Sequence, residues 1–379
     1  MPSQPRSVRG AVLREMGRPA PYAQSRPLEI RTLDLAGPGP DELLVRIRAA
    51  GLCHSDLSVI DGSRPRVMPM VLGHEASGEV VEAGAGAGFA PGDRVVLTFV
   101  PSCACCAACL DGRAALCEPA AAANAAGELV GGGRRWGELD GLALHHHLGV
   151  SAFADHVVVS ARSAVRVGPE LPFEVAAVFG CAVLTGAGAA LNAARVEVGD
   201  SVAVFGLGGV GFAALLAAVA AGATTIVAVD TVAAKLDLAR ELGATHAVPA
   251  GEDAVAEVRA VTGGGARKVL ETVGSERVLA DAYAATRRGG ITVTVGLPDP
   301  SRRLSIPALS LVTEERTLRG SYLGSSVPAR DIPRFLTLHG AGRLPVERLL
   351  THRLALDDIN AGFDRLARGE AVRQVVVFD

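Results

Sequence analysis

The 379-residue chain lacks the features of a membrane protein or a nucleic-acid-binding protein. Its formal net charge is only −3, so no excess of one sign favours nucleic acid or an anionic membrane. Its longest apolar stretch, residues 210–221, is too short to span a bilayer and contains a glycine. The first ten residues are polar and contain no apolar core of a signal peptide. We therefore expect a cytoplasmic protein.

Lysine is also scarce, since Lys235 and Lys268 are the only two, and arginine supplies the other long basic side chains. With abundant alanine and glycine, this pattern is typical of a GC-rich genome, and it carries no functional conclusion. Cysteine is present at seven positions. In a reducing compartment such cysteines are more often metal ligands or free thiols than disulfides.

The length predicts two domains, and the sequence pattern changes between residues 160 and 201. The first 160 residues contain short alternating strands, such as residues 43–47, separated by glycine-rich turns. From residue 201, apolar strands alternate with helices, which predicts a doubly wound parallel sheet. The last 50 or so residues are mixed again. We expect residues 1–182 and 326–379 to form a β-rich domain, and residues 183–325 an α/β domain.

A glycine-rich loop follows the first of these apolar strands, residues 202–205. Residues 206–211 read Gly-Leu-Gly-Gly-Val-Gly and match G-x-G-x-x-G between a strand and a helix. The glycines allow a pyrophosphate to approach the backbone at a helix N-terminus. Asp230 ends the next strand, where it can bind both ribose hydroxyls and repel a 2′-phosphate, which favours NAD over NADP. The alternatives are a turn that only packs a helix on a strand, and an Asp230 that only caps a helix.

Four cysteines have the spacing of a closed zinc site. Cys103, Cys106 and Cys109 are three residues apart, and Cys117 follows after seven intervening residues. Four thiolates on a tight lobe can surround one zinc tetrahedrally, which is typical of a structural site. The alternative is a group of free thiols, or one disulfide with spare thiols. Cys105 falls outside the spacing and is interpreted as a bystander, although it would be a ligand if the lobe were shifted.

A second group combines a thiol, an imidazole and carboxylates. Residues 51–56 read Gly-Leu-Cys-His-Ser-Asp, residues 73–75 read Gly-His-Glu, and Cys181 follows much later. Two cysteines and one histidine are the ligand types of an open, catalytic zinc site. Taken alone, each of these residues would more often be a core or turn residue.

In this order, the motifs resemble those of the zinc-dependent medium-chain alcohol dehydrogenases, and the resemblance covers nearly the whole chain. The long segment 117–149 is similar to that of the dimeric animal-type and glutathione-linked formaldehyde dehydrogenase branches. The resemblance implies a GroES-like catalytic domain with two zinc ions and a Rossmann domain that binds NAD. It also implies a homodimer joined through the Rossmann domains, and reversible oxidation of an alcohol by hydride transfer.

The resemblance assigns Cys53, His74 and Cys181 to the catalytic zinc. The structural zinc is assigned to Cys103, Cys106, Cys109 and Cys117. Asp56 and Glu75 resemble carboxylates that support the ligands, and Ser55 resembles the hydroxyl that hands on the substrate proton.

Further residues are similar to cofactor and substrate contacts. His54 and Arg373 resemble cations at the cofactor pyrophosphate, although each alone would usually be a solvated surface cation. The expected cofactor residues are His54, Thr185, Gly206, Gly208, Gly209, Val210, Gly211, Asp230, Lys235, Val295, Leu297 and Arg373. The expected substrate pocket consists of Arg64, Phe99, Ala122, His147, Leu148, Leu297 and Tyr322.

The chain departs from the family pattern in its proton relay and its pocket. Ser58 stands where many members have a histidine relay base, and Arg64 and Ala121 stand where glutathione-linked enzymes have an acidic residue and an arginine. The sequence therefore favours a medium-sized or aromatic alcohol, with no thiol conjugate. Arg64 and Arg66 are interpreted as solvated loop residues in preference to contacts for an anionic substrate. The alternatives are a formaldehyde dehydrogenase that uses another thiol such as mycothiol and, more remotely, a non-catalytic binding protein.

Overall fold

The computed structural model describes residues 5–379, which form two compact units. The first unit contains the described residues up to Cys181, with Val327–Ile332 and Leu350–Asp379. The second contains Ala182–Ser326 and Pro333–Leu349. The sequence placed residues 333–349 in the first domain, but this segment packs with the second unit. Its Leu344, Val346 and Leu349 are fully buried, and Arg343 donates a hydrogen bond to the Ala220 carbonyl.

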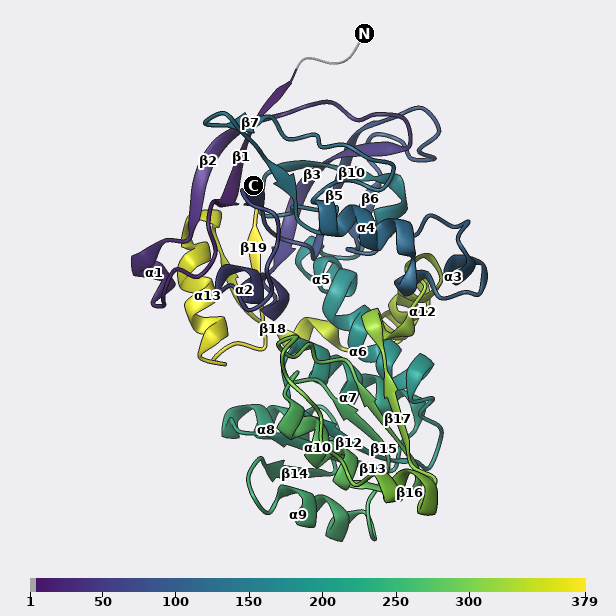
Figure 1. Cartoon of the computed structure of the whole chain (residues 1–379). Coiled ribbons are helices and arrows are strands. Elements are labelled where there is room, and N and C mark those ends of the chain that lie inside the picture. The colour runs from purple at the N-terminus through teal and green to yellow at the C-terminus, as the bar shows by residue number, and fades with distance from the viewer. Residues whose placement is uncertain (1–4) are drawn as a thin grey trace. The chain divides into compact units, whose positions relative to one another are not determined.

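The larger sheet of the first unit is mostly antiparallel (Figure 1). Its strand order is β11-β6-β5-β3-β19-β18, and β10 pairs with β3 as well. The strands are β3 (Glu42–Gly51), β5 (Ala76–Ala83), β6 (Arg94–Leu97), β10 (His156–Ser160), β11 (Ala164–Arg166), β18 (Leu350–Leu354) and β19 (Arg373–Val377). β3 ends two residues before Cys53, and β19 begins with Arg373, so this sheet supports the candidate site.

A smaller sheet of the first unit has the order β2-β1-β4-β9. Its strands are β1 (Arg6–Leu13), β2 (Leu28–Leu35), β4 (Met70–Val71) and β9 (His145–His146). β4 and β9 are parallel neighbours, so the residues that follow them leave the sheet side by side. β7 (Glu138–Leu139) and β8 (Leu142–Ala143) form a separate hairpin. The helices are α1 (Tyr22–Ser25), α2 (His54–Ile60), α3 (Ala107–Leu110), α4 (Glu118–Ala126) and α13 (Ile359–Ala367).

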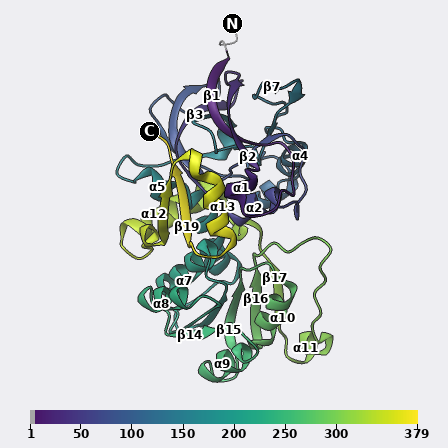
Figure 2. The same cartoon turned by 90° about the vertical axis from the view of Figure 1, so that its left-hand side faces the viewer.

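The second unit is a six-stranded sheet in which every neighbouring pair is parallel. The strands, in spatial order, are β14 (His246–Pro249), β13 (Thr225–Asp230), β12 (Ser201–Phe205), β15 (Ala266–Glu271), β16 (Thr286–Thr294) and β17 (Thr317–Gly320). The helices are α7 (Gly209–Ala221), α8 (Ala233–Glu241), α9 (Ala254–Val261), α10 (Glu276–Ala284) and α11 (Ala308–Thr313) (Figure 2). In α12 (Pro328–Gly340), the residues from Pro333 onward belong to this unit, and those up to Ile332 belong to the first. This order is that of the doubly wound dinucleotide-binding fold and confirms the predicted fold class.

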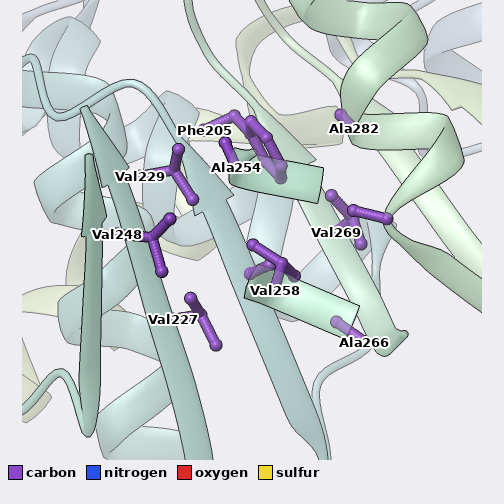
Figure 3. Close-up of a cluster of buried hydrophobic side chains, with 11 residues drawn as sticks. Phe205, Val227, Val229, Val248, Ala254, Val258, Ala266, Val269 and Ala282 are labelled. Carbon is purple, nitrogen blue, oxygen red and sulfur yellow. The ribbon is translucent and has the colours of Figure 1, made fainter. Parts of the chain in front are cut away.

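The core on one face of this sheet is made mainly of valine and alanine (Figure 3). Val227 and Val229 lie two residues apart on β13 and therefore point to the same face. They belong to one buried cluster with Ala254 and Val258 of α9. Fully burying one such valine contributes about 1.5 kcal/mol or more. This packing holds the strand ends that carry the glycine loop and Asp230.

One long helix, Phe173–Ala193, connects the two units. It consists of α5 (Phe173–Val178), a π-helical turn (Phe179–Val183), α6 (Leu184–Gly188) and a second π-helical turn (Ala189–Ala193). The helix is long and apolar enough to cross a membrane, but 89% of its most apolar window is buried inside the protein. It is longer than residues 210–221, which the sequence indicated as the longest apolar stretch. Core helices of globular proteins often have such a composition, so this helix is weak evidence of a membrane span.

Candidate metal centre and cofactor site

Three potential metal ligands converge inside the first unit. Cys53 caps the N-terminus of α2, His74 follows β4, and Cys181 lies in the first π-helical turn. Their ligand atoms all lie within 4.8 Å of one another, and the residues are 7%, 1% and 5% exposed. The structure therefore brings together three residues that are 128 positions apart from first to last.

Two glycines make this approach possible. Gly73 has φ +95°, and a Cβ atom there would lie 2.6 Å from the backbone nitrogen of Phe153. A Cβ atom at Gly180 would lie 2.2 Å from the carbonyl oxygen of Leu97. Any larger residue would therefore push His74 or Cys181 away from its present place. Short π-helical turns are frequent at functional sites, and here one carries Cys181.

The hydrogen bonds of His74 fit a metal ligand. Its Nδ1 atom lies 3.0 Å from Oδ1 of Asp56, so Nδ1 carries the proton and Nε2 has a lone pair. Nε2 is buried and makes no hydrogen bond among residues 5–379. A buried polar atom without a partner costs free energy unless a ligand satisfies it. A zinc ion between Nε2 and the two thiols would do so, and two cysteines with one histidine are a known zinc ligand set.

The surroundings of Cys53, Cys181 and His74 shift their pKa values. The pKa of Cys53 is well below the ordinary thiol value, chiefly because the Cys181 thiol donates to its thiolate, with help from His74 and Arg373. The same interaction raises the pKa of Cys181, which is the proton donor of the pair. Burial alone would lower the pKa of His74, but the charge of Asp56 and its hydrogen bond raise it well above the usual value. A divalent cation would replace these shared protons.

Arg373 lies directly behind these thiols. It is almost fully buried, and its Nη1 atom donates to the Leu52 carbonyl while Nη2 donates to Oε2 of Glu75, both at 2.9 Å. Burial would lower its pKa, but Glu75 and the two thiolates raise it. Gly51 gives Glu75 its space, since a Cβ there would lie 2.2 Å from Oε1 of that glutamate. Arg373 therefore balances buried negative charge, and its contact with the cofactor pyrophosphate stays a prediction.

His147 also lies at this site, beside Asp56. The sequence predicted it as a substrate-pocket residue but did not predict its contact with Asp56. Its Nδ1 atom lies 3.2 Å from Oδ1 of Asp56, the oxygen that His74 also contacts. The His147 ring stands edge-on to the His74 ring, with centroids 5.5 Å apart. Burial lowers the pKa of His147, which favours its neutral imidazole. Of the three consecutive histidines, only this one reaches the metal centre.

The four-cysteine lobe also assembles as the spacing predicts. The sulfur atoms of Cys103, Cys106, Cys109 and Cys117 all lie within 4.8 Å of one another. The Cys103 and Cys117 sulfurs accept hydrogen bonds from the backbone nitrogens of Cys106 and Cys103, at 3.3 and 3.2 Å. Backbone donors from Cys105 and Cys106 lower the pKa of Cys103 to about 6, which favours the thiolate form that metals bind. Cys105 is exposed and lies outside this group.

The expected substrate pocket residues fall into two sets. Phe99 and His147 both pack edge-on against the ring of His74, and the backbone of Phe99 is held by the amide of Asn124. Leu148 is buried beside His147 with φ +52°. Among the other predicted residues, Arg64 is half-buried, and Ala122, Leu297 and Tyr322 are exposed.

The proposed proton path begins on helix α2. Ser55 is half-buried in the first turn, and His54 is exposed at its start. The hydroxyl of Ser58 donates a hydrogen bond to the His54 carbonyl at 2.8 Å. A serine hydroxyl is not a base near neutral pH, so the side chain at position 58 cannot take up the relayed proton as a histidine would.

The glycine loop in the second unit has the geometry of a nucleotide cradle. Gly206 has φ +91°, and Gly208 caps α7, with no protein atom within 4 Å of a Cβ built there. A Cβ atom at Gly211 would lie only 1.8 Å from the Gly206 carbonyl oxygen. Gly211 is thus required by packing, whereas the open space at Gly208 is free for a ligand. Gly209 begins α7 behind it.

Asp230 lies beside this loop at the end of β13. Its Oδ2 atom accepts a hydrogen bond from the Leu207 nitrogen at 2.7 Å, and Oδ1 accepts one from the Val232 nitrogen at 2.9 Å. Lys235, on α8, is half-buried. Asp230 therefore holds the loop and can also offer its charge to a ribose.

The remaining cofactor candidates lie at the same end of the second unit. Val295 and Leu297 follow β16, whose carboxyl end shares an edge with those of β12 and β13. Thr185 is on α6 and Val210 is on α7. The two helices approach closely because Gly186 of α6 has no side chain, and a Cβ atom there would lie 2.1 Å from the Val210 carbonyl oxygen. Ligands of such folds bind outside the carboxyl ends of the strands.

Sequence reasoning missed the residues that fix the segment before His147. Arg135 makes a two-point ion pair with Glu42, and its backbone nitrogen donates to Nε2 of buried His146 at 3.1 Å. Trp136 packs near the His146 ring. One signal was available, because adjacent residues of a strand point to opposite faces and His146 and His147 could not both face one site.

Known proteins are similar in sequence and structure to nearly the full length of the chain. Residues 39–169 match the model of the alcohol dehydrogenase GroES-like domain, and residues 209–339 match that of the zinc-binding dehydrogenase. The chain is 41% identical over 379 residues to a geraniol dehydrogenase of Castellaniella defragrans, which covers 98% of both chains. It is 35% identical to an S-(hydroxymethyl)glutathione dehydrogenase of Paracoccus denitrificans, over 98% of this chain and 100% of that one. The crystal structure of benzyl alcohol dehydrogenase from Acinetobacter calcoaceticus is similar with a TM-score of 0.91 and 31% identity, over 99% of this chain and 100% of that chain.

Proposed function

Because the chain belongs to the zinc-dependent medium-chain alcohol dehydrogenase family, we propose that Cys53, His74 and Cys181 hold its catalytic zinc. Cys103, Cys106, Cys109 and Cys117 hold the structural zinc. The enzyme is an NAD-dependent alcohol dehydrogenase, and its substrate is a medium-sized or aromatic primary or secondary alcohol. The observation that carries the site assignment is the buried Nε2 atom of His74. It makes no hydrogen bond in the described part of the chain, and the ligand atom of His74 lies within 4.8 Å of both cysteine sulfurs.

The chain's own residues prepare and support this chemistry. When bound, the zinc supplies Lewis-acid polarisation of the alcohol oxygen, and the nicotinamide accepts the hydride. Asp56 fixes the tautomer of His74, and Arg373 with Glu75 balances the charge of the thiolates. Ser55 receives the alcohol proton and passes it on. Beyond Ser55 the proton leaves through water, because Ser58 is not a base.

The cofactor assignment rests on the second unit. The open space at Gly208 would receive the pyrophosphate, and Asp230 and Lys235 would bind the adenosine ribose. The negative charge of Asp230 opposes a 2′-phosphate, which accounts for NAD in preference to NADP. Thr185, Val210, Val295 and Leu297 would hold the nicotinamide half, and the predicted role of His54 at the pyrophosphate stays an expectation.

The substrate assignment rests on the rings beside His74. Phe99 and His147 give this side of the metal centre an aromatic wall with one polar edge. Two of the relatives are named for geraniol and for benzyl alcohol, which are alcohols of the proposed size. Arg64 and Ala121 replace the residues that bind a glutathione conjugate, so a free alcohol is favoured.

A substrate panel tests this function. Purified enzyme with NAD is given straight-chain alcohols of increasing length, benzyl alcohol and terpenoid alcohols, and NADH formation is followed by absorbance. We expect turnover of aromatic and terpenoid alcohols without any thiol, and none in the Cys53→Ser variant. Turnover restricted to formaldehyde with a thiol such as mycothiol would replace the proposal with the thiol-dependent alternative, which the relative from Paracoccus denitrificans represents.

The second unit offers a surface for the expected homodimer. β17 is an edge strand of the parallel sheet, and its unpaired edge can extend the sheet into a second copy. The preceding helix α11 exposes Leu309 and Val312, at 73% and 77%. A dimer formed by edge-to-edge pairing would cover both features. Sedimentation of the Val312→Asp variant as a monomer, with the wild type as a dimer, would support this assembly. We also propose that the protein is cytoplasmic.

A further inference from the structure

The carboxylate of Asp56 lies against two imidazoles. Its Oδ1 atom accepts a hydrogen bond from Nδ1 of His74 at 3.0 Å and from the backbone nitrogen of Gly73 at 3.2 Å. Nδ1 of His147 lies 3.2 Å from the same oxygen but is not aligned for a hydrogen bond to it. All three side chains are at most 1% exposed. Water therefore does not screen the charge of Asp56, so the polar ring edge of His147 interacts with it even without an aligned hydrogen bond.

His147 reaches this position because of the strand pairing. β4 and β9 run parallel, and His74 and His147 follow them by three residues and one residue. A tight turn then fixes His147, since its backbone nitrogen donates to Oγ of buried Ser151 at 2.9 Å. The Ser151 and Val150 nitrogens both donate to the His147 carbonyl. The imidazole is thus held beside Asp56 by the backbone and is not a mobile surface group.

We propose that His147 is a positioning residue of the metal site, which draws part of the Asp56 charge away from His74 and so weakens the hold on the catalytic zinc. This inference rests on the proposed catalytic zinc site. A carboxylate behind a ligand histidine raises the basicity of that ligand and tightens metal binding. A second N–H dipole beside the same oxygen reduces this effect, because it compensates part of the negative charge.

Two substitutions separate the donor from the ring. His147→Phe keeps an aromatic ring against His74 and removes the Nδ1 donor. His147→Asn removes the ring and keeps an amide nitrogen near the place of Nδ1. A residue that only fills space would be replaced best by phenylalanine, whereas a donor would be replaced best by asparagine.

The measured quantity is the rate at which zinc passes from the holoenzyme to an excess of chromogenic chelator. The phase that belongs to the catalytic zinc is the one that the Cys53→Ser variant lacks. The phase of the four-cysteine lobe serves as the folding control and stays unchanged. Since loss of a supporting carboxylate changes metal affinity by about 10–100-fold, loss of one of its donors should slow catalytic zinc release roughly two- to five-fold in His147→Phe. His147→Asn releases zinc at the wild-type rate, and Asp56→Asn releases it faster.

The opposite order of rates overturns the proposal. Release from His147→Phe that is as fast as or faster than wild type shows that His147 does not compete for Asp56, and equal rates for both variants exclude a role of the donor. If His147→Phe disturbs the structural phase, His147→Leu takes its place. Failure of the underlying zinc assignment looks different, because wild type and Cys53→Ser would then show the same release phases.

Discussion

The two glycines of the nucleotide loop provide a sharp test, because the structure assigns them different tasks. An alanine Cβ at position 211 would lie 1.8 Å from the Gly206 carbonyl oxygen, so the loop or α7 must move. Such overpacking costs about 1–3 kcal/mol. At about 2–4 °C per kcal/mol for a unit of this size, Gly211→Ala should lower the melting temperature by roughly 2–12 °C.

Gly208→Ala should behave in the opposite way. Its backbone has φ −76°, which alanine adopts readily, and no protein atom lies within 4 Å of the added Cβ. The loss of a glycine cap costs less than about 1 kcal/mol. The methyl group would, however, occupy the space of the pyrophosphate. We expect the Kd for NADH to rise at least about tenfold, or about 1.4 kcal/mol.

Both variants are compared with wild type and with Gly340→Ala by thermal melting and by NADH fluorescence titration. Gly340 is a matched control at the end of α12, with open space around its Cβ and no cofactor role. Unchanged NADH binding in Gly208→Ala would refute the cradle, and a wild-type melting temperature in Gly211→Ala would refute the packing argument.

Three further predictions concern the cofactor, the proton path and acid stability. Asp230→Asn removes the charge that opposes a 2′-phosphate, so the ratio of kcat/KM for NAD to that for NADP should fall at least about tenfold, and an unchanged ratio in initial-rate assays would contradict this role. Because Ser58 offers no base, turnover at low pH should rise with the concentration of imidazole-type buffers at constant ionic strength, whereas a rate independent of buffer would show another relay. Burial lowers the pKa of His146 to about 3, whereas an unfolded histidine has a pKa of about 6.5. As the pH falls from about 6.5 towards 3, the unfolded chain binds a proton that the folded chain does not, so the free energy of unfolding decreases. His146→Gln keeps an acceptor for the Arg135 nitrogen and should lose roughly 2 kcal/mol less than wild type between pH 6.5 and 5 in urea unfolding; equal losses would contradict it.

Local motifs explain why much of the architecture could be predicted. The strand–glycine loop–helix pattern around Gly206 and the position of Asp230 depend on neighbouring residues, and the parallel order of the second unit confirms the fold class. The same holds for the four-cysteine lobe, whose sulfur atoms converge within a span of fifteen residues. Family membership and the zinc and NAD cofactors are likewise confirmed.

Long-range packing explains what the sequence did not predict. The contact of His147 with Asp56 depends on the parallel pairing of β4 with β9, which joins segments about 75 residues apart. The burial of Arg373 against Glu75 depends on the pairing of β19 with β3. The boundary between the two units falls inside α12, after Ile332, because Leu344, Val346 and Leu349 are buried in the second unit. None of these pairings has a local sequence signal. The functional roles of the individual site residues stay predictions.

Elemental analysis of zinc in wild type and in Cys53→Ser tests the central claim most directly. Two zinc ions per chain are expected in wild type, one in the four-cysteine lobe and one on Cys53, His74 and Cys181. The Cys53→Ser variant should retain one zinc ion and lose NADH formation with every alcohol. One zinc ion or none in the wild-type protein, or full activity in the variant, would contradict the account.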